Sequence, residues 1–198
     1  MIRPHLTAVL LSVCILPFGS ATAIAGGQDC HYISMADLAG KKIPSFETFP
    51  ARPIPLGLRP APVKFQSHPK AMRYRTAIRK GGAAGPNFAG HFTIVGWGCG
   101  SSCIAWTVVD AKEGTVYFPP DDIATISTNH VDEVGPNEPE PHFFGLRFRL
   151  DSNLLIILGA PREDESREGI LFYRWTGKTF ELIQAHRIQR KWCTDSRQ

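Results

Sequence analysis

The chain has 198 residues and a formal net charge of +4, and hydrophobic residues make up 43% of it. A charge this small gives no strong general attraction to nucleic acid or to anionic lipid, so it excludes partners recognised by net charge alone. The hydrophobic content is typical of a folded domain and not of a disordered chain.

The N-terminus has the three regions of a secretory signal peptide. Arg3 and His5 precede an apolar run over residues 6–18, and small residues follow over residues 19–25. The run is shorter than the about 20 apolar residues of a membrane span. We therefore expect a signal peptide over residues 1–25, cleaved after Ala23 or Ala25, and a periplasmic or extracellular location with no membrane span after cleavage. Residues 26–198 then form a single disulfide-stapled domain of about 170 residues.

Four cysteines remain after cleavage, and an even number in an oxidising compartment predicts disulfides. Cys99 and Cys103 flank a short loop of glycine and serine that can close locally, which leaves Cys30 to pair with Cys193. The alternative is a zinc site. The C-x3-C spacing is unusual for zinc and no second close pair exists, so we expect no metal and no cofactor.

The first half of the domain predicts little regular structure. Residues 34–40 form a short helix with a serine cap and a glycine stop. The segment over residues 44–69 contains seven prolines, which forbid a helix or a central strand. Its interleaved apolar residues favour an extended segment wrapped on the surface and docked into the core. Residues 70–80 predict a second short helix, whose basic side chains are either a solvated face or an anion-binding patch.

The second half predicts strands, over residues 91–97, 104–110, 115–118, 144–150, 154–158, 170–175 and 179–184. A polar loop over residues 119–141 and a charged loop over residues 161–169 separate them. Residues 107–117 and 172–182 both read as strand, tight glycine turn and strand, similar to propeller-blade hairpins. The prediction is a mainly β (α+β) fold, an antiparallel β-meander with one or two short N-terminal helices.

Residues 85–120 are the most distinctive part of the chain. They contain N-F-A-G-H at 87–91, W-G-C-G-S-S-C at 97–103 and D-A-K-E-G-T-V-Y at 110–117. This combination resembles a family of exported bacterial proteins of unknown function with the pattern N-F-A-G-H … W-G-C-G-x-x-C … D-x-x-x-G-x-V-Y. The resemblance implies a secreted bacterial protein and supplies no activity.

The alternate glycines of this segment mark a candidate binding surface. Gly98 and Gly100 remove side chains from one face of a strand next to Trp97, so a ligand or another backbone can approach closely. The alternative is that the glycines only let the strand bend and the Cys99–Cys103 loop close. The spacing does not fit a dinucleotide-binding loop.

His91 and Asp110 are the weak candidates for catalysis. A Cys-His nucleophile is not expected, because His91 and Cys99 would lie about 26 Å apart along an unbroken strand and Cys99 is predicted to be oxidised. Such a nucleophile would need His91 or His142 near Cys99 in space, with the thiol free. We expect His91 to hydrogen-bond the turn over residues 85–87. The acids crowded into residues 119–141 lack the spacing of a calcium loop.

These observations favour a non-enzymatic binding module for another protein or an envelope polymer, which includes an inhibitor or an immunity protein. No nucleic acid partner is expected. Four tryptophans are candidate contact residues, with core packing as the alternative for each: Trp97, Trp106, Trp175 and Trp192. The rival functions are an envelope-acting hydrolase that uses His91 and acidic residues, and a structural envelope component.

Overall fold

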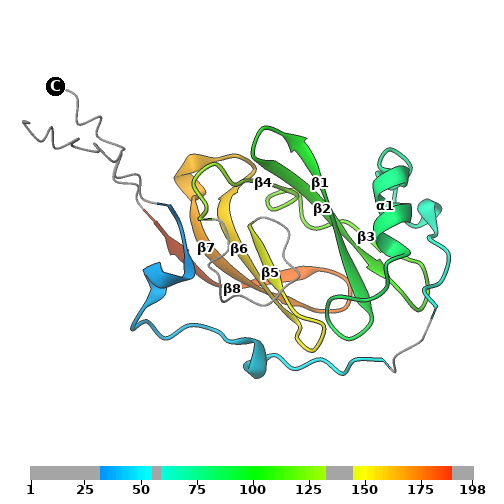
Figure 1. The fold of residues 1–198 in the computed structure, drawn as a ribbon, viewed down its shortest axis with the longest axis horizontal. Coiled ribbons are helices and arrows are strands. Elements are labelled where there is room, and N and C mark those ends of the chain that lie inside the picture. The colour runs from blue at the N-terminus through cyan, green and yellow to red at the C-terminus, as the bar shows by residue number, and fades with distance from the viewer. Residues whose placement is uncertain (1–31, 55–58, 133–144, 189–198) are drawn as a thin grey trace, which may run out of the picture.

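The computed structural model describes residues 32–54, 59–132 and 145–188. The predicted mainly β fold is confirmed: eight strands form one open antiparallel sheet, accompanied by one short α-helix and a few 3-10 turns (Figure 1). The predicted signal peptide, the Cys30–Cys193 pairing, His142 and Trp192 all lie outside the described residues. No helix within the three described ranges is long and apolar enough to cross a membrane.

The strands follow the sequence prediction closely. They are β1 (Phe92–Gly100), β2 (Cys103–Asp110), β3 (Val116–Tyr117), β4 (Thr125–Ser127), β5 (Leu146–Phe148), β6 (Leu154–Pro161), β7 (Gly169–Trp175) and β8 (Phe180–Arg187). The order in the sheet is β1-β2-β4-β6-β7-β8, with β3 paired to β2 and β5 paired to β6. Strand β4 lies in the predicted polar loop and was not expected. Its pairing with β2 and β6 joins the two halves of the sheet.

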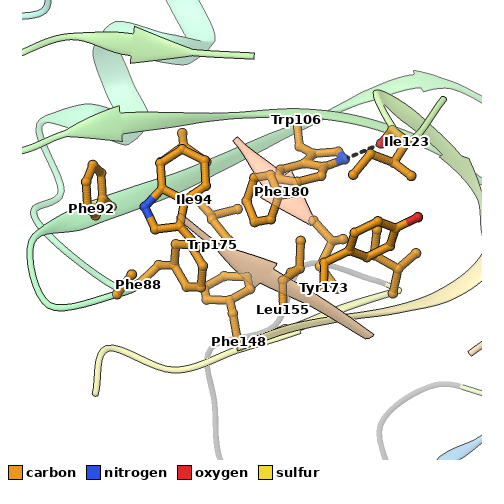
Figure 2. Close-up of a cluster of buried hydrophobic side chains, with 14 of the residues drawn as sticks. Phe88, Phe92, Ile94, Trp106, Ile123, Phe148, Leu155, Tyr173, Trp175 and Phe180 are labelled. Carbon is orange, nitrogen blue, oxygen red and sulfur yellow. Dashed lines mark hydrogen bonds between the residues drawn. The ribbon is translucent and has the colours of Figure 1, made fainter. Parts of the chain in front are cut away.

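The sheet buries side chains on both faces, because successive residues of a strand point in opposite directions. In β6, Leu155 and Ile157 enter the main core, whereas Leu154 and Ile156 pack on the other face. The main core is rich in aromatic rings contributed by β1 and β2 on one side and β5–β8 on the other (Figure 2). The apolar run that predicts β6 is therefore that of a central strand covered on both faces.

Segments that come before β1 in the chain cover the outer faces of the sheet. The 3-10 turns η1 (Met35–Leu38) and η2 (Phe46–Thr48) lie near the second core cluster, which Met35 and Phe46 cover. The turn η3 (Phe65–Ser67) and α1 (Arg75–Gly82) cover the outer side of β1 and β2, and η4 (Glu165–Arg167) precedes β7. The described parts of the proline-rich segment run along the outside of the domain, as predicted (Figure 1).

Helix α1 begins and ends later than the predicted range of 70–80. Residues 70–74 form turns, and the helix continues through Gly81 and Gly82. These glycines are tolerated because the helix packs closely on β1, where a Cβ atom at Gly81 would overlap the side chain of Val95. Local propensity predicts that the glycines end the helix, but tertiary packing extends it past them.

The tight turn between β2 and β3 packs against the proline-rich segment, and glycine substitutions there can test this contact. Gly114 has a φ of +76°, and a Cβ atom there would overlap the carbonyl oxygen of Pro62. Gly177 also has a positive φ, of +95°, but no atom lies within 4 Å of its Cβ position. We expect G177A to lower the free energy of unfolding by about 1–2 kcal/mol through backbone strain alone. We expect G114A to cost about 1–3 kcal/mol more, because the proline-rich segment must move.

Urea denaturation of both variants measures this difference. Equal losses of stability in G114A and G177A would show that residues 61–64 do not pack on the turn as described.

Candidate functional site

The pairing of β1 with β2 brings the two candidate catalytic residues together. Phe92 is opposite Asp110 in the antiparallel register, and the His91 carbonyl accepts a hydrogen bond from the Ala111 N–H. The His91 Nε2 atom therefore lies 3.6 Å from Asp110 Oδ2. The prediction that His91 holds the turn over residues 85–87 is wrong. Thr93 donates to the Gly85 carbonyl, and the Asn87 side chain binds the backbone of Ile94 instead.

Asp110 has a structural role of its own. Its Oδ1 atom accepts hydrogen bonds from the backbone N–H groups of Lys112 and Glu113, at 2.7 and 3.1 Å, and so closes the turn after β2. The side chain is 8% exposed, whereas that of His91 is 24% exposed and lies against the ring of Phe92. The pair thus consists of a fixed carboxylate and a partly accessible imidazole.

Burial sets the protonation of His91. Loss of hydration lowers the pKa of His91 below its ordinary value, and Lys112 lowers it further, while the negative charges of Asp110 and Glu113 oppose the shift. The imidazole is therefore neutral at pH 7 and able to accept a proton.

His91 lines a cleft of about 770 Å³ at the end of the sheet where several turns meet. The extended residues 50–54 form one wall, the turn after β2 contributes Lys112, and the β7–β8 turn contributes Arg174 to Gly177. We call this the basic cleft, because its lining includes Arg52, Lys112 and Arg174 and no acidic residue. Phe92 and Trp175 contribute apolar surface.

The cations of the basic cleft differ in their availability. Arg174 forms an ion pair with Glu181, and both side chains are about half exposed. Arg52 and Lys112 are exposed and pair with no carboxylate among the residues that the structure describes. An anion that enters the cleft could therefore pair with Arg52 and Lys112 without breaking an existing ion pair.

Trp97 lies elsewhere, in a second and smaller hollow of about 190 Å³. We call it the aromatic groove, because the half-buried rings of Tyr74, Trp97 and Phe118 line it together with Lys70 and Arg73. The ring centroids are 4.7 Å apart for Tyr74 and Trp97 and 6.4 Å apart for Trp97 and Phe118. Of the three predicted binding residues, Trp97 lines this groove, whereas Gly98 and Gly100 do not.

Gly98 and Gly100 lie on the exposed end of β1, beyond the groove. No atom comes within 4 Å of a Cβ built at Gly98, so nothing in the described structure uses the space that this glycine leaves. Gly100 sits where the register between β1 and β2 shifts, next to the disulfide between Cys99 and Cys103. The local disulfide is present as predicted, and it makes a Cys99 nucleophile unavailable in this structure.

Two of the other tryptophans belong to the core. Trp106 is 1% exposed and donates its indole N–H to the Ile123 carbonyl, and Trp175 is 4% exposed among the rings of Phe92 and Phe180 (Figure 2). Trp106 is therefore mainly a core residue, although part of it lines the aromatic groove. Trp175 is also mainly a core residue, although part of it lines the basic cleft.

Sequence reasoning missed most of the residues around both hollows. Arg52, Lys112 and Arg174 come from three separate segments, and so do Tyr74, Trp97 and Phe118. A hairpin register counted back from the Cys99–Cys103 loop would have placed His91 near Asp110.

No cluster of three or more His, Cys, Asp or Glu side chains suited to a metal ion occurs among the described residues. No family model, curated protein or solved structure matches this chain.

The electrostatic coupling of His91 and Asp110 can be tested by NMR titration of the His91 ring. We expect its titration midpoint below the ordinary histidine value, and D110N should lower it further, because the negative charge that favours the imidazolium is removed. The amide oxygen can still accept the turn hydrogen bonds, so the fold should be kept. D164N is the control, since Asp164 caps η4. An unchanged midpoint in D110N would contradict the pairing.

Proposed function

We propose that the protein is a non-enzymatic binding module that works outside the cytoplasm, and that its basic cleft receives the acidic groups of an envelope polymer. One observation carries the proposal: the cleft lining gathers Arg52, Lys112 and Arg174 and contains no carboxylate. Converging turns at one end of a rigid sheet are a common location for ligand sites.

The chemistry of the cleft favours a polymer with anionic groups over a neutral one. Arginine and lysine bind carboxylate and phosphate through charge-assisted hydrogen bonds, which are stronger than neutral ones. The exposed Pro53 and the half-buried Ile54 offer contact to the less polar parts of a repeating unit. Binding should weaken with added salt, because exposed charges are screened over about 8 Å at physiological ionic strength.

Calorimetric titration with defined oligomers tests this proposal. We expect oligogalacturonate, which carries carboxylates, or a glycerol-phosphate oligomer to bind, and neutral maltohexaose not to bind. R52A/K112A should weaken binding at least tenfold, since each lost charge-assisted hydrogen bond is worth about 1.5–3 kcal/mol and about 1.4 kcal/mol corresponds to tenfold.

The matched control is K41A/K42A, which removes the same charge from exposed side chains outside the cleft. If both double variants bind equally well, or if maltohexaose binds as tightly as the acidic oligomers, the cleft is not the site.

Hydrolysis in the same cleft is the second candidate, and the His91–Asp110 pair favours it. With Nε2 facing Asp110, the Nδ1 atom of a neutral His91 is left to take a proton from water. That water would attack the bond to be cleaved, and the carboxylate would stabilise the imidazolium that forms. The imidazolium would then return its proton to the oxygen that leaves as the bond breaks. Among the described residues, Asp110 contributes the carboxylate that the geometry fixes beside His91, and Thr176 contributes a hydroxyl group to the lining.

The two candidates differ in whether products form. Under the binding proposal, chromatography of the acidic oligomers after long incubation shows them intact. Shorter products from the wild-type protein, absent with H91Q although H91Q still binds, would establish hydrolysis instead. H186Q serves as the matched control, because His186 lies on β8 away from the cleft lining.

A further inference from the structure

We propose that the aromatic groove is a second ligand site, and that it takes one acidic sugar ring. The groove and the basic cleft share no lining residue, so this inference does not depend on the function proposed for the cleft. It rests on three features of the groove: its rings, its charges and its size.

The rings form an apolar surface that lines the groove and remains partly exposed after the core has packed. Tyr74, Trp97 and Phe118 are all half-buried, with Tyr74 and Phe118 6.2 Å apart between ring centroids. They come from the turn before α1, from β1 and from the residue after β3. Because α1 packs against β1 and Val63 and Phe65 cover the same cluster, the surface is held in place before any ligand arrives. The C–H face of a sugar ring packs well against such rings.

The charges around the rings select an anion. Lys70 and Arg73 line the groove, and the Arg73 guanidinium lies 5.7 Å from the Tyr74 ring centroid with no carboxylate partner among the described residues. Lys70 pairs with Asp121 at 2.6 Å, but both side chains are exposed, and such pairs contribute little and exchange easily. These cations would repel a cationic ligand, so the three rings are not suited to bind one by cation–π contacts.

The surrounding chain strengthens this selection. Residues 48–109 contain eight lysines and arginines and no aspartate or glutamate, although the whole chain has a net charge of only +4. Three more of these cations, Arg75, Arg79 and Lys80, lie on α1 next to the groove. The positive potential of this face is therefore larger than the net charge of the protein indicates.

The size of the groove limits the ligand to one ring. Its volume of about 190 Å³ is below the range of about 300–1,000 Å³ that holds drug-sized ligands. Single-stranded nucleic acid also combines stacking with positive charge, but it is bound along grooves in which successive bases stack over several nucleotides. One short groove fits a single uronic acid unit of a polysaccharide better.

Fluorescence titration of the wild-type protein with digalacturonic acid tests the proposal. Trp97 and the buried Trp106 both line the groove, so a ligand there should change the tryptophan emission, and W97F should reduce that change. We expect R73A to weaken binding at least fivefold. R75A should weaken binding clearly less than R73A does, because Arg75 adds only to the positive potential of this face and does not line the groove. R52A/K112A should also leave this signal unchanged, which separates the groove from the cleft.

Three results would overturn the inference. Equal binding of neutral cellobiose would remove the role of the charges, and equal loss of affinity in R73A and R75A would show a general electrostatic effect. Tighter binding of a short oligothymidylate than of the sugar acid would assign the groove to nucleic acid.

Discussion

The register between β1 and β2 decides where His91, Asp110 and Trp97 lie. It places Gly96 opposite Trp106 and Phe92 opposite Asp110, so that Ile94 and Trp106 enter the main core while Val95 and Val109 face α1. A slip by one residue would turn each of these side chains to the opposite face. The same register sets His91 beside Asp110 at one end of the hairpin and turns Trp97 toward Tyr74 near the other end. The Cys99–Cys103 disulfide closes the hairpin loop and so restricts the alternatives.

The residues of the N-F-A-G-H motif at 87–91 mostly serve this framework, and through it the cleft. Asn87 binds both the N–H and the carbonyl of Ile94, which fixes the entry into β1. Gly90 has a φ of +84°, and a Cβ atom there would overlap the carbonyl of Arg52. Its own carbonyl accepts a hydrogen bond from the Ile54 N–H. A glycine at this position therefore lets the proline-rich segment come close enough for Arg52 to line the cleft beside His91.

Sequence patterns predicted the elements that local sequence determines, and missed those that form only through contacts with distant segments. The apolar run of β6 and the alternation in β5 reflect burial of the strands themselves, so they could be read directly. Strand β4 has only three residues and owes its existence to β2 and β6 on either side. The tryptophans illustrate the same limit. Trp97 and Trp106 are the same residue type on paired strands, yet only the register shows that one faces the core and the other a groove. The cleft cations come from separate turns and share no local pattern.

The distribution of carboxylates explains how a chain with a small net charge can still offer the two proposed anion sites. Asp110 lies close to the basic cleft, but its Oδ1 atom is occupied by two backbone N–H groups and its Oδ2 atom faces His91, so it does not pair with Arg52 or Lys112. Asp121 neutralises Lys70 only through an exposed pair, which an incoming anion can replace at little cost. Acids are excluded from residues 48–109 and are either committed to turns or weakly paired near the two sites. Local arrangement of charge, and not its sum, therefore determines which ligands this surface attracts.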